Sequence, residues 1–325
     1  MTQTTSLGFA IIGTESLDRF LEFYQGDIGM DSSPVSRLEG QGFERHFDLP
    51  AGSRAKAVMM SVGQSSIGRV LGIEFQAADR PHIADASPAP FSGYWNLNFY
   101  VDDIGAACAT IAQRGYRFWS KPVRHAVPGG AGAPIEAIFM GPDNVAINLV
   151  ELAGPPDSQT AEIARETASL PRSRTGFSQV ATTAHATRDL ETAVAFYREV
   201  LGMWPVIDAV LENPQVNELT GRPANARTHV MWMRGAHRYG KVALSQALNY
   251  TLVDRAATVA APAIGYLAQS FALSDLTAGL AKAAILGVRP MSVPALLDLA
   301  GGAPVTAVMM RAPGSGALLQ LTGAS

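Results

Sequence analysis

The sequence predicts an α+β protein made of four βαβββ modules, and internal repetition is the main reason. Residues 16–24, followed by Gly-Met, return as residues 189–197 with the same dipeptide, 173 positions later. Residues 102–115 return as 274–287, 172 positions later, and a third match begins at Gly132 and recurs 170 positions on. Three colinear matches at nearly constant spacing indicate two homologous halves.

Each half divides again into two modules. In the first, residues 9–12 form a short apolar strand, Ser16 supplies a helix N-cap, and Leu17, Phe20 and Tyr24 follow at helical spacing. Two further apolar runs, separated by turn residues, predict the remaining strands. The same order restarts near residues 95, 180 and 266. The predicted modules cover residues 5–77, 93–152, 177–248 and 264–323.

We expect the modules to pair within each half. This gives a first domain over residues 1–153, a Gly- and Pro-bounded linker over 154–176 with a polar helical stretch, and a second domain over 177–325.

Composition excludes several classes of protein. The net charge of −3 gives no basic field for a nucleic-acid backbone, and the single cysteine, Cys108, excludes an internal disulfide framework. No apolar run approaches the roughly 18 residues that cross a bilayer, and the N-terminus lacks the features of a secretion signal. We therefore expect a cytoplasmic protein without membrane or nucleic-acid partners. The charged fraction of 16% suggests buried surface in a homo-oligomer.

Several short motifs carry a resemblance to a known family. They are the helix signatures at 23–24 with 29–30 and at 196–197 with 202–203, the strand-to-helix junction at 99–103 and the late turn at 141–144. The chain resembles the vicinal oxygen chelate superfamily, which includes glyoxalase I, extradiol dioxygenases and bleomycin-binding proteins. The resemblance implies that two paired modules form a cup around one divalent metal. It also implies that His from a first strand and Glu from a last strand bind this metal.

The predicted ligand positions do not carry that set. Counting from the helix starts places the first-strand positions at Phe9, Asn96, Thr182 and Ala268, and the last-strand positions near Glu74, Asn148, Ser245 or Gln246, and Gln320. None is His, and only Glu74 is an acid. The acid/base His that extradiol enzymes place before the late turn is also missing in both halves. We therefore expect no metal and no cofactor.

Glu74 is the first catalytic candidate, because it interrupts an apolar strand. If its side of the strand faces the cup, desolvation raises its pKa and suits it to proton transfer, with Asn96 and Asn148 holding an oxyanion. The alternative is a solvated carboxylate on the outer face. His229, on a strand expected to line the second cup, is a further acid/base candidate.

The ligand-binding candidates follow from the same cup positions. Arg45, His46 and Arg80 lie on or near loops that could cover the first cup, where an arginine would clamp a carboxylate. Phe9, Thr182 and Gln320 are expected to line the cups. Glu136 is less compelling than Glu74 because the second half has Thr306 in its place.

These observations leave three functions open. The first is a metal-independent enzyme that acts on a small apolar or aromatic carbonyl compound by proton transfer, as an isomerase or lyase. The second is a non-catalytic small-molecule binding protein of the bleomycin-resistance type. The third is a divergent glyoxalase or extradiol dioxygenase with a metal in a non-standard register.

Overall fold

The computed structural model describes residues 5–85, 90–256, 258–299 and 303–323, and it contains the four predicted modules in order. The first module comprises β1 (Leu7–Gly13), α1 (Leu17–Leu21) with a π-helical turn (Glu22–Asp27), β2 (Asp31–Ser32), β3 (Ser36–Glu39), α2 (Gln41–Phe47), β4 (Arg54–Ser61) and β5 (Arg69–Phe75). The second comprises β6 (Phe91–Val101), α3 (Ile104–Gln113), β7 (Val123–Arg124), β8 (Ile135–Met140) and β9 (Ala146–Glu151). Short 3₁₀ turns (Pro128–Gly130 and Pro142–Asn144) flank β8.

The second half repeats this order after the linker, whose helix is α4 (Gln159–Thr167). The third module comprises β10 (Val180–Ala186), α5 (Leu190–Glu199), β11 (Trp204–Leu211), α6 (Pro214–Leu219), β12 (Thr228–Arg234), β13 (Lys241–Ala247) and β14 (Val253–Asp254). The fourth comprises β15 (Gly265–Leu273), α7 (Leu276–Ile285), β16 (Ala295–Leu297), β17 (Val305–Arg311) and β18 (Leu318–Gly323).

The first helix of every module begins at an equivalent capping residue. The side chains of Ser16, Asp103, Asp189 and Asp275 each accept a hydrogen bond from the backbone N–H three residues later, at distances of 3.4, 2.9, 3.0 and 2.9 Å. Such a cap satisfies one of the N–H groups that have no partner inside the helix. The repeat therefore extends from sequence to local structure.

The predicted pairing of modules within each half is wrong. The first and fourth modules share one nine-stranded sheet, here called the terminal sheet, and the second and third share another, called the central sheet. Strand β1 pairs antiparallel with β15, and β6 pairs antiparallel with β10. All four modules present a similar first-strand edge, so the repeat itself does not say which edges meet. Each sheet draws on both predicted domains, whose bounds stay a prediction.

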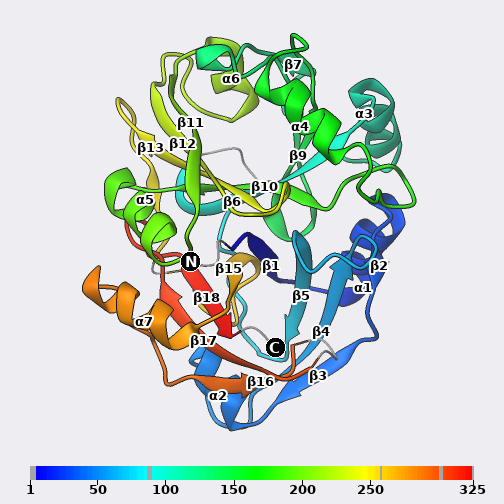
Figure 1. Cartoon of the computed structure of the whole chain (residues 1–325). Coiled ribbons are helices and arrows are strands. Elements are labelled where there is room, and N and C mark those ends of the chain that lie inside the picture. The colour runs from blue at the N-terminus through cyan, green and yellow to red at the C-terminus, as the bar shows by residue number, and fades with distance from the viewer. Residues whose placement is uncertain (1–4, 86–89, 257, 300–302, 324–325) are drawn as a thin grey trace.

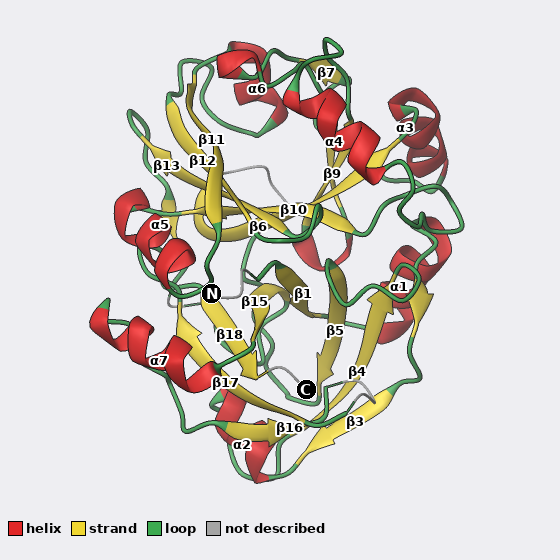
Figure 2. Cartoon of the chain, viewed as in Figure 1, coloured by secondary structure: helices red, strands yellow, loops and turns green. Residues whose placement is uncertain are grey.

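The two curled sheets pack back to back, with α1 and α3 flanking one side and α5 and α7 the other (Figures 1 and 2). Their convex faces share one hydrophobic core that includes Phe20, Phe99, Phe196 and Phe271. A hydrogen bond also joins the sheets: Thr183 Oγ1 on β10 lies 2.9 Å from the Tyr266 hydroxyl on β15. The concave faces consequently point away from each other, and each sheet has its own cup.

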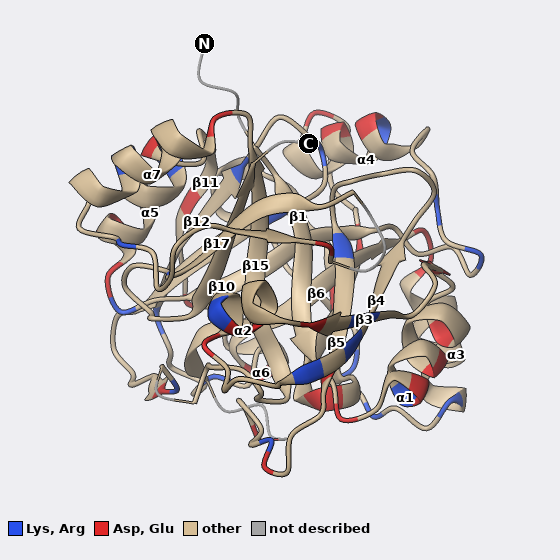
Figure 3. Cartoon of the chain, turned by 90° about the horizontal axis from the view of Figure 1, so that it is seen from below, with Lys and Arg blue, Asp and Glu red and all other residues tan. Residues whose placement is uncertain are grey.

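Charged residues lie mainly on helices, loops and edge strands, whereas the middle strands of both sheets carry few (Figure 3). None of the helices in the described ranges combines the length and the apolar character that crossing a bilayer requires.

Candidate functional site

The cup of the terminal sheet is filled by the protein's own side chains. Helix α2 brings Phe43 and Phe47 against Phe9 and other apolar residues of this face. His46, also on α2, is buried and lies 2.8 Å from Gln320, from Nε2 to Oε1. Burial lowers the pKa of His46 to about 4, against the smaller opposing effect of this hydrogen bond. Phe9, His46 and Gln320 do meet in one cup, but as parts of a packed core.

The two predicted carboxylate clamps lie outside this core. The Arg45 guanidinium donates to Gln41 Oε1 at 3.2 Å on the exposed face of α2. The Arg80 guanidinium donates to the backbone oxygens of Thr14 and Glu15 at 3.1 and 3.2 Å, so it fastens the turn between β1 and α1.

Glu74 does not face a cup. Its neighbours at alternate positions, Val70 and Gly72, face α1, and Phe20 lies against Gly72. The Glu74 carboxylate accepts a hydrogen bond from the Leu17 N–H at 2.7 Å. A carboxylate at this position satisfies a free backbone N–H and opposes the partial positive charge of the helix N-terminus. The predicted placement of Glu74 as a base in the cup is therefore wrong.

The error has a physical cause in strand register. In the second module Glu151 accepts a hydrogen bond from the Ile104 N–H at 3.0 Å, so Glu151 is the counterpart of Glu74. The counterpart of Asn148 is Leu71, which lies opposite Ile11 in the terminal sheet. An odd displacement along a strand moves a side chain to the other face, and the sequence count was displaced by three.

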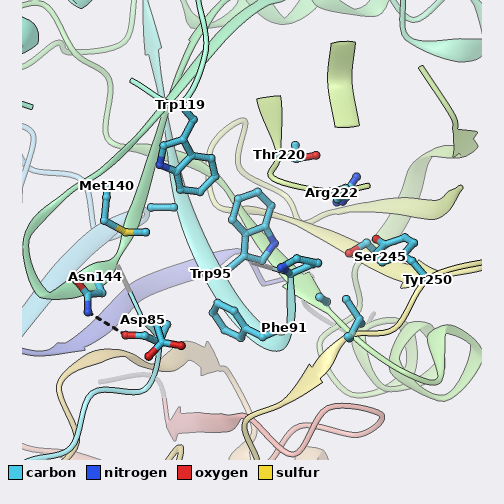
Figure 4. Close-up of a pocket in the computed structure, with 15 residues that line it drawn as sticks. Asp85, Phe91, Trp95, Trp119, Met140, Asn144, Thr220, Arg222, Ser245 and Tyr250 are labelled. Atoms are coloured by element: carbon cyan, nitrogen blue, oxygen red, sulfur yellow. Dashed lines mark hydrogen bonds between the residues drawn. The ribbon is translucent and has the colours of Figure 1, made fainter. Parts of the chain in front are cut away.

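The cup of the central sheet holds an open cavity, whose volume of about 480 Å³ includes space continuous with solvent (Figure 4). Its lining includes the start of β6 and residues of the connectors that follow β5 and β13. Its apolar wall is formed by aromatic and Met side chains: Phe91, Trp95, Trp119 and Met140. Its polar wall is formed by Asp85, Asn144, Thr220, Arg222, Ser245 and Tyr250. A concave surface with a mostly apolar lining and a few polar groups is typical of small-molecule sites.

A buried polar chain lies further along the same cup. His125 Nε2 is 2.9 Å from Glu136 Oε1, and the Asn148 amide donates to Glu136 Oε2 at 2.6 Å. Burial alone lowers the pKa of His125, but the Glu136 hydrogen bond and charge outweigh it and raise this pKa. Burial alone raises the pKa of Glu136, but the His125 hydrogen bond and charge outweigh it and lower this pKa. Neither residue is among those that line the cavity.

Three further predicted residues lie in the central sheet. Asn96 is buried, and its side-chain oxygen accepts from the Ala184 N–H at 2.9 Å, which ties β6 to β10. Thr182 is buried opposite Asn98. His229 does not join the cavity lining: its Nε2 lies 2.7 Å from Asp208 Oδ1, and its side chain is 34% exposed.

The donor set does not fit the metal that the family resemblance implies. The symmetry-related cup positions carry Phe9, Leu71, Ala268 and Gln320 in the terminal sheet, and Asn96, Asn148, Thr182 and Ala243 in the central sheet. Among the described residues, no three His, Cys, Asp or Glu side chains come together as a metal-binding group. The His125 and Glu136 side chains bond to each other rather than to a common point.

Sequence reasoning missed Arg222 and set Glu136 aside. The sequence offers no signal for Arg222, because only the three-dimensional course of the turn after α6 brings this residue to the cavity. Glu136 had one available signal, since it too interrupts an apolar strand.

Comparison with known proteins agrees with this architecture. Residues 6–149 match the family model described as the Glyoxalase/Bleomycin resistance protein/Dioxygenase superfamily, and residues 177–323 repeat the same modules. This match places residues 6–149 in the superfamily, and the second half of the chain has the same modules. Among curated protein sequences, none matches it.

Two solved structures of this superfamily's fold are similar over nearly the whole chain. Glyoxalase I from Zea mays has a TM-score of 0.63 at 14% identity, and the match covers 98% of this chain and 92% of the maize chain. A putative dioxygenase from Bacillus subtilis has a TM-score of 0.58 at 11% identity, covering 99% and 86% of the two chains. At these identities the likeness shows the fold alone.

Proposed function

We propose that this superfamily member binds a small, largely apolar aromatic molecule in the cavity of the central sheet, as a non-catalytic binding protein. The contrast between the two cups carries the proposal. The terminal cup is filled by α2, whereas the central cup holds an open cavity walled by two tryptophans, a phenylalanine and a methionine. Flat aromatic walls contact a planar ligand over a large area without losing much side-chain freedom.

The residues around the cavity favour binding over proton transfer. The carboxylate that lines it, Asp85, is 74% exposed and pairs with Arg255 at 2.6 Å. Glu136, the more deeply buried carboxylate of this cup, is held by His125 and Asn148 outside the lining. A general base must lie within hydrogen-bond reach of the proton that it removes. An isomerase or lyase reaction therefore lacks a positioned base among the described lining residues.

Tryptophan fluorescence tests the proposal directly. All four tryptophans lie between residues 95 and 232, within the two modules that form the central sheet. We would titrate the protein with cinnamate and with its neutral analogue cinnamamide. We expect at least one of these compounds to quench the tryptophan fluorescence saturably. NMR spectra of the compound after incubation with the protein should show that it is chemically unchanged. W95A should weaken binding about tenfold or more through lost stacking area. The matched control W204A removes an exposed tryptophan outside the cavity and should leave binding unchanged.

Absence of saturable quenching by both compounds at millimolar concentration would contradict the proposal. Equal effects of W95A and W204A would place the ligand elsewhere, and conversion of the probe would show an enzyme instead.

A further inference from the structure

The cavity of the central sheet holds an arginine that the protein itself does not neutralise. Arg222 lines the cavity beside Ser245 and Tyr250 (Figure 4). Its Nη1 atom is shielded from solvent and has no hydrogen-bond partner among the described residues. None of the carboxylates in the described ranges lies within 4.0 Å of its guanidinium.

Arg222 as a whole is half-buried, but its Nη1 atom is shielded from solvent, and an unpaired charge in such surroundings is energetically unfavourable. Burial lowers the pKa of Arg222, with only a smaller opposing effect from Tyr250, because the apolar surroundings disfavour its charge. Proteins normally pair such a group with an acid or with backbone oxygens. Arg311 and Arg80 in this chain follow that rule, since each donates to several backbone carbonyl oxygens. Arg222 departs from it at the wall of a cavity.

The local structure holds Arg222 in place. Helix α6 ends at Leu219, and Gly221, two residues later, has a φ of +66° that turns the chain sharply. The Arg222 N–H donates to the Asn217 oxygen at 2.7 Å. The Asn217 amide in turn donates to the oxygens of Ala224 and Ala226 at 3.1 and 2.9 Å. The turn that carries Arg222 is thus fixed before any ligand arrives, which reduces the entropic cost of binding.

We infer that the ligand of this cavity is an aromatic monocarboxylate, with its carboxylate on Arg222 and its ring against Trp95 and Trp119. This inference rests on the proposed function and narrows its ligand class. A guanidinium presents a planar pair of N–H donors that match a carboxylate, and a single negative charge balances the single unpaired positive charge. The acid at the cavity, Asp85, is already paired with Arg255 and does not compete for Arg222.

The comparison of cinnamate with cinnamamide tests the inference in the unmodified protein. The two molecules share ring and shape and differ in charge. We expect cinnamate to bind at least tenfold more tightly at pH 7, and the preference to persist in 0.5 M NaCl because the pair is shielded from solvent. Equal affinities would overturn the inference while leaving the proposed function standing. Binding of neither compound would overturn both.

A variant pair tests whether Arg222 is the group responsible. R222Q should lose the preference for the acid and keep the affinity for the amide within about threefold. The control R227Q alters an exposed arginine paired with Glu212 at 3.1 Å, five residues further on, and should keep the preference. Circular dichroism and thermal unfolding verify the fold of both variants. Retention of a tenfold acid preference in folded R222Q would overturn the assignment, and the wild-type ratio tests the inference even where R222Q fails to fold.

Discussion

At the scale of single residues, Glu74 shows that a carboxylate within an apolar strand can have a structural role instead of a catalytic one. Its sequence context matches that of a desolvated base, yet its oxygen accepts from the Leu17 N–H at the start of α1. Glu151 repeats this contact with Ile104 in the next module. Because the same glutamate and the same hydrogen bond occur in two modules of one chain, the folding of the module explains why the residue is there.

The replacement E74Q should therefore affect stability and not binding. The amide keeps the shape but loses the charge that stabilises the helix terminus. We expect the free energy of unfolding to fall by about 1 kcal/mol in urea denaturation. The equivalent variant E151Q should lose a similar amount, and both should bind cinnamate as the wild type does. A tenfold loss of affinity in E74Q with unchanged stability would return Glu74 to the functional site.

His185 predicts how stability depends on pH. It is fully buried, with Nε2 2.6 Å from Ser315 Oγ across the two sheets, and burial lowers its pKa from 6.5 to about 3. In the unfolded chain this imidazole therefore binds a proton below about pH 6.5, whereas in the folded chain it binds one only near pH 3. Stability from this residue is present above pH 6.5 and is lost as pH falls toward the folded pKa.

Urea unfolding at pH 7 and pH 5 measures this effect. The loss from His185 should be about 2 kcal/mol between these values. In H185Q, which keeps a neutral hydrogen-bonding side chain, the total loss between pH 7 and pH 5 should be smaller by that amount. The same pH dependence in both proteins would show that His185 is not held neutral in the fold.

At the scale of elements, the two cups differ because helices cover them differently. Helix α2 inserts Phe43 and Phe47 into the terminal cup, where the two rings pack 5.4 Å apart. Helix α6 places Leu219 over Ile138 and Ala146 in the central cup and leaves the cavity beside them. The insertion after the second strand of a module therefore decides whether a cup becomes core or site.

We expect F47A to destabilise the protein without changing ligand binding. Removing a buried aromatic ring from a packed core costs about 3–5 kcal/mol, and Phe47 is 4% exposed. The cavity lies in the other sheet, so the affinity of folded F47A for cinnamate should stay at the wild-type value in calorimetry. A stable F47A protein with weakened binding would place the ligand in the terminal cup.

At the scale of the whole molecule, much of the fold followed from the sequence. The duplication, the helix caps and the βαβββ order can be predicted because they depend on local residue types and on spacing. The pairing of modules depends on which equivalent edges meet, and nothing local distinguishes β1–β15 from β1–β6. The same limit applied to the site. Asn148 and Thr182 lie in the central sheet and their roles stay predictions, whereas Glu74 needed a register that only the sheet supplies.

Module pairing predicts which fragments fold. Residues 90–256 contain the central sheet, all four tryptophans and most of the cavity lining, whereas Ala84 and Asp85 of that lining lie outside this segment. We expect this fragment to unfold cooperatively in urea, though less stably than the full chain because the core between the sheets is lost. The fragment 1–153, which contains half of each sheet, should not. Cooperative unfolding of 1–153 alone would favour pairing within each half.

The location of the ligand is the central claim, and a crystal structure with 4-bromocinnamate tests it most directly. The bromine marks the ring by its anomalous signal. We predict one strong peak between Trp95 and Trp119, with the carboxylate on the Arg222 guanidinium. A bromine peak in the terminal cup beside Phe9 and Gln320, or a carboxylate turned away from Arg222, would contradict the account.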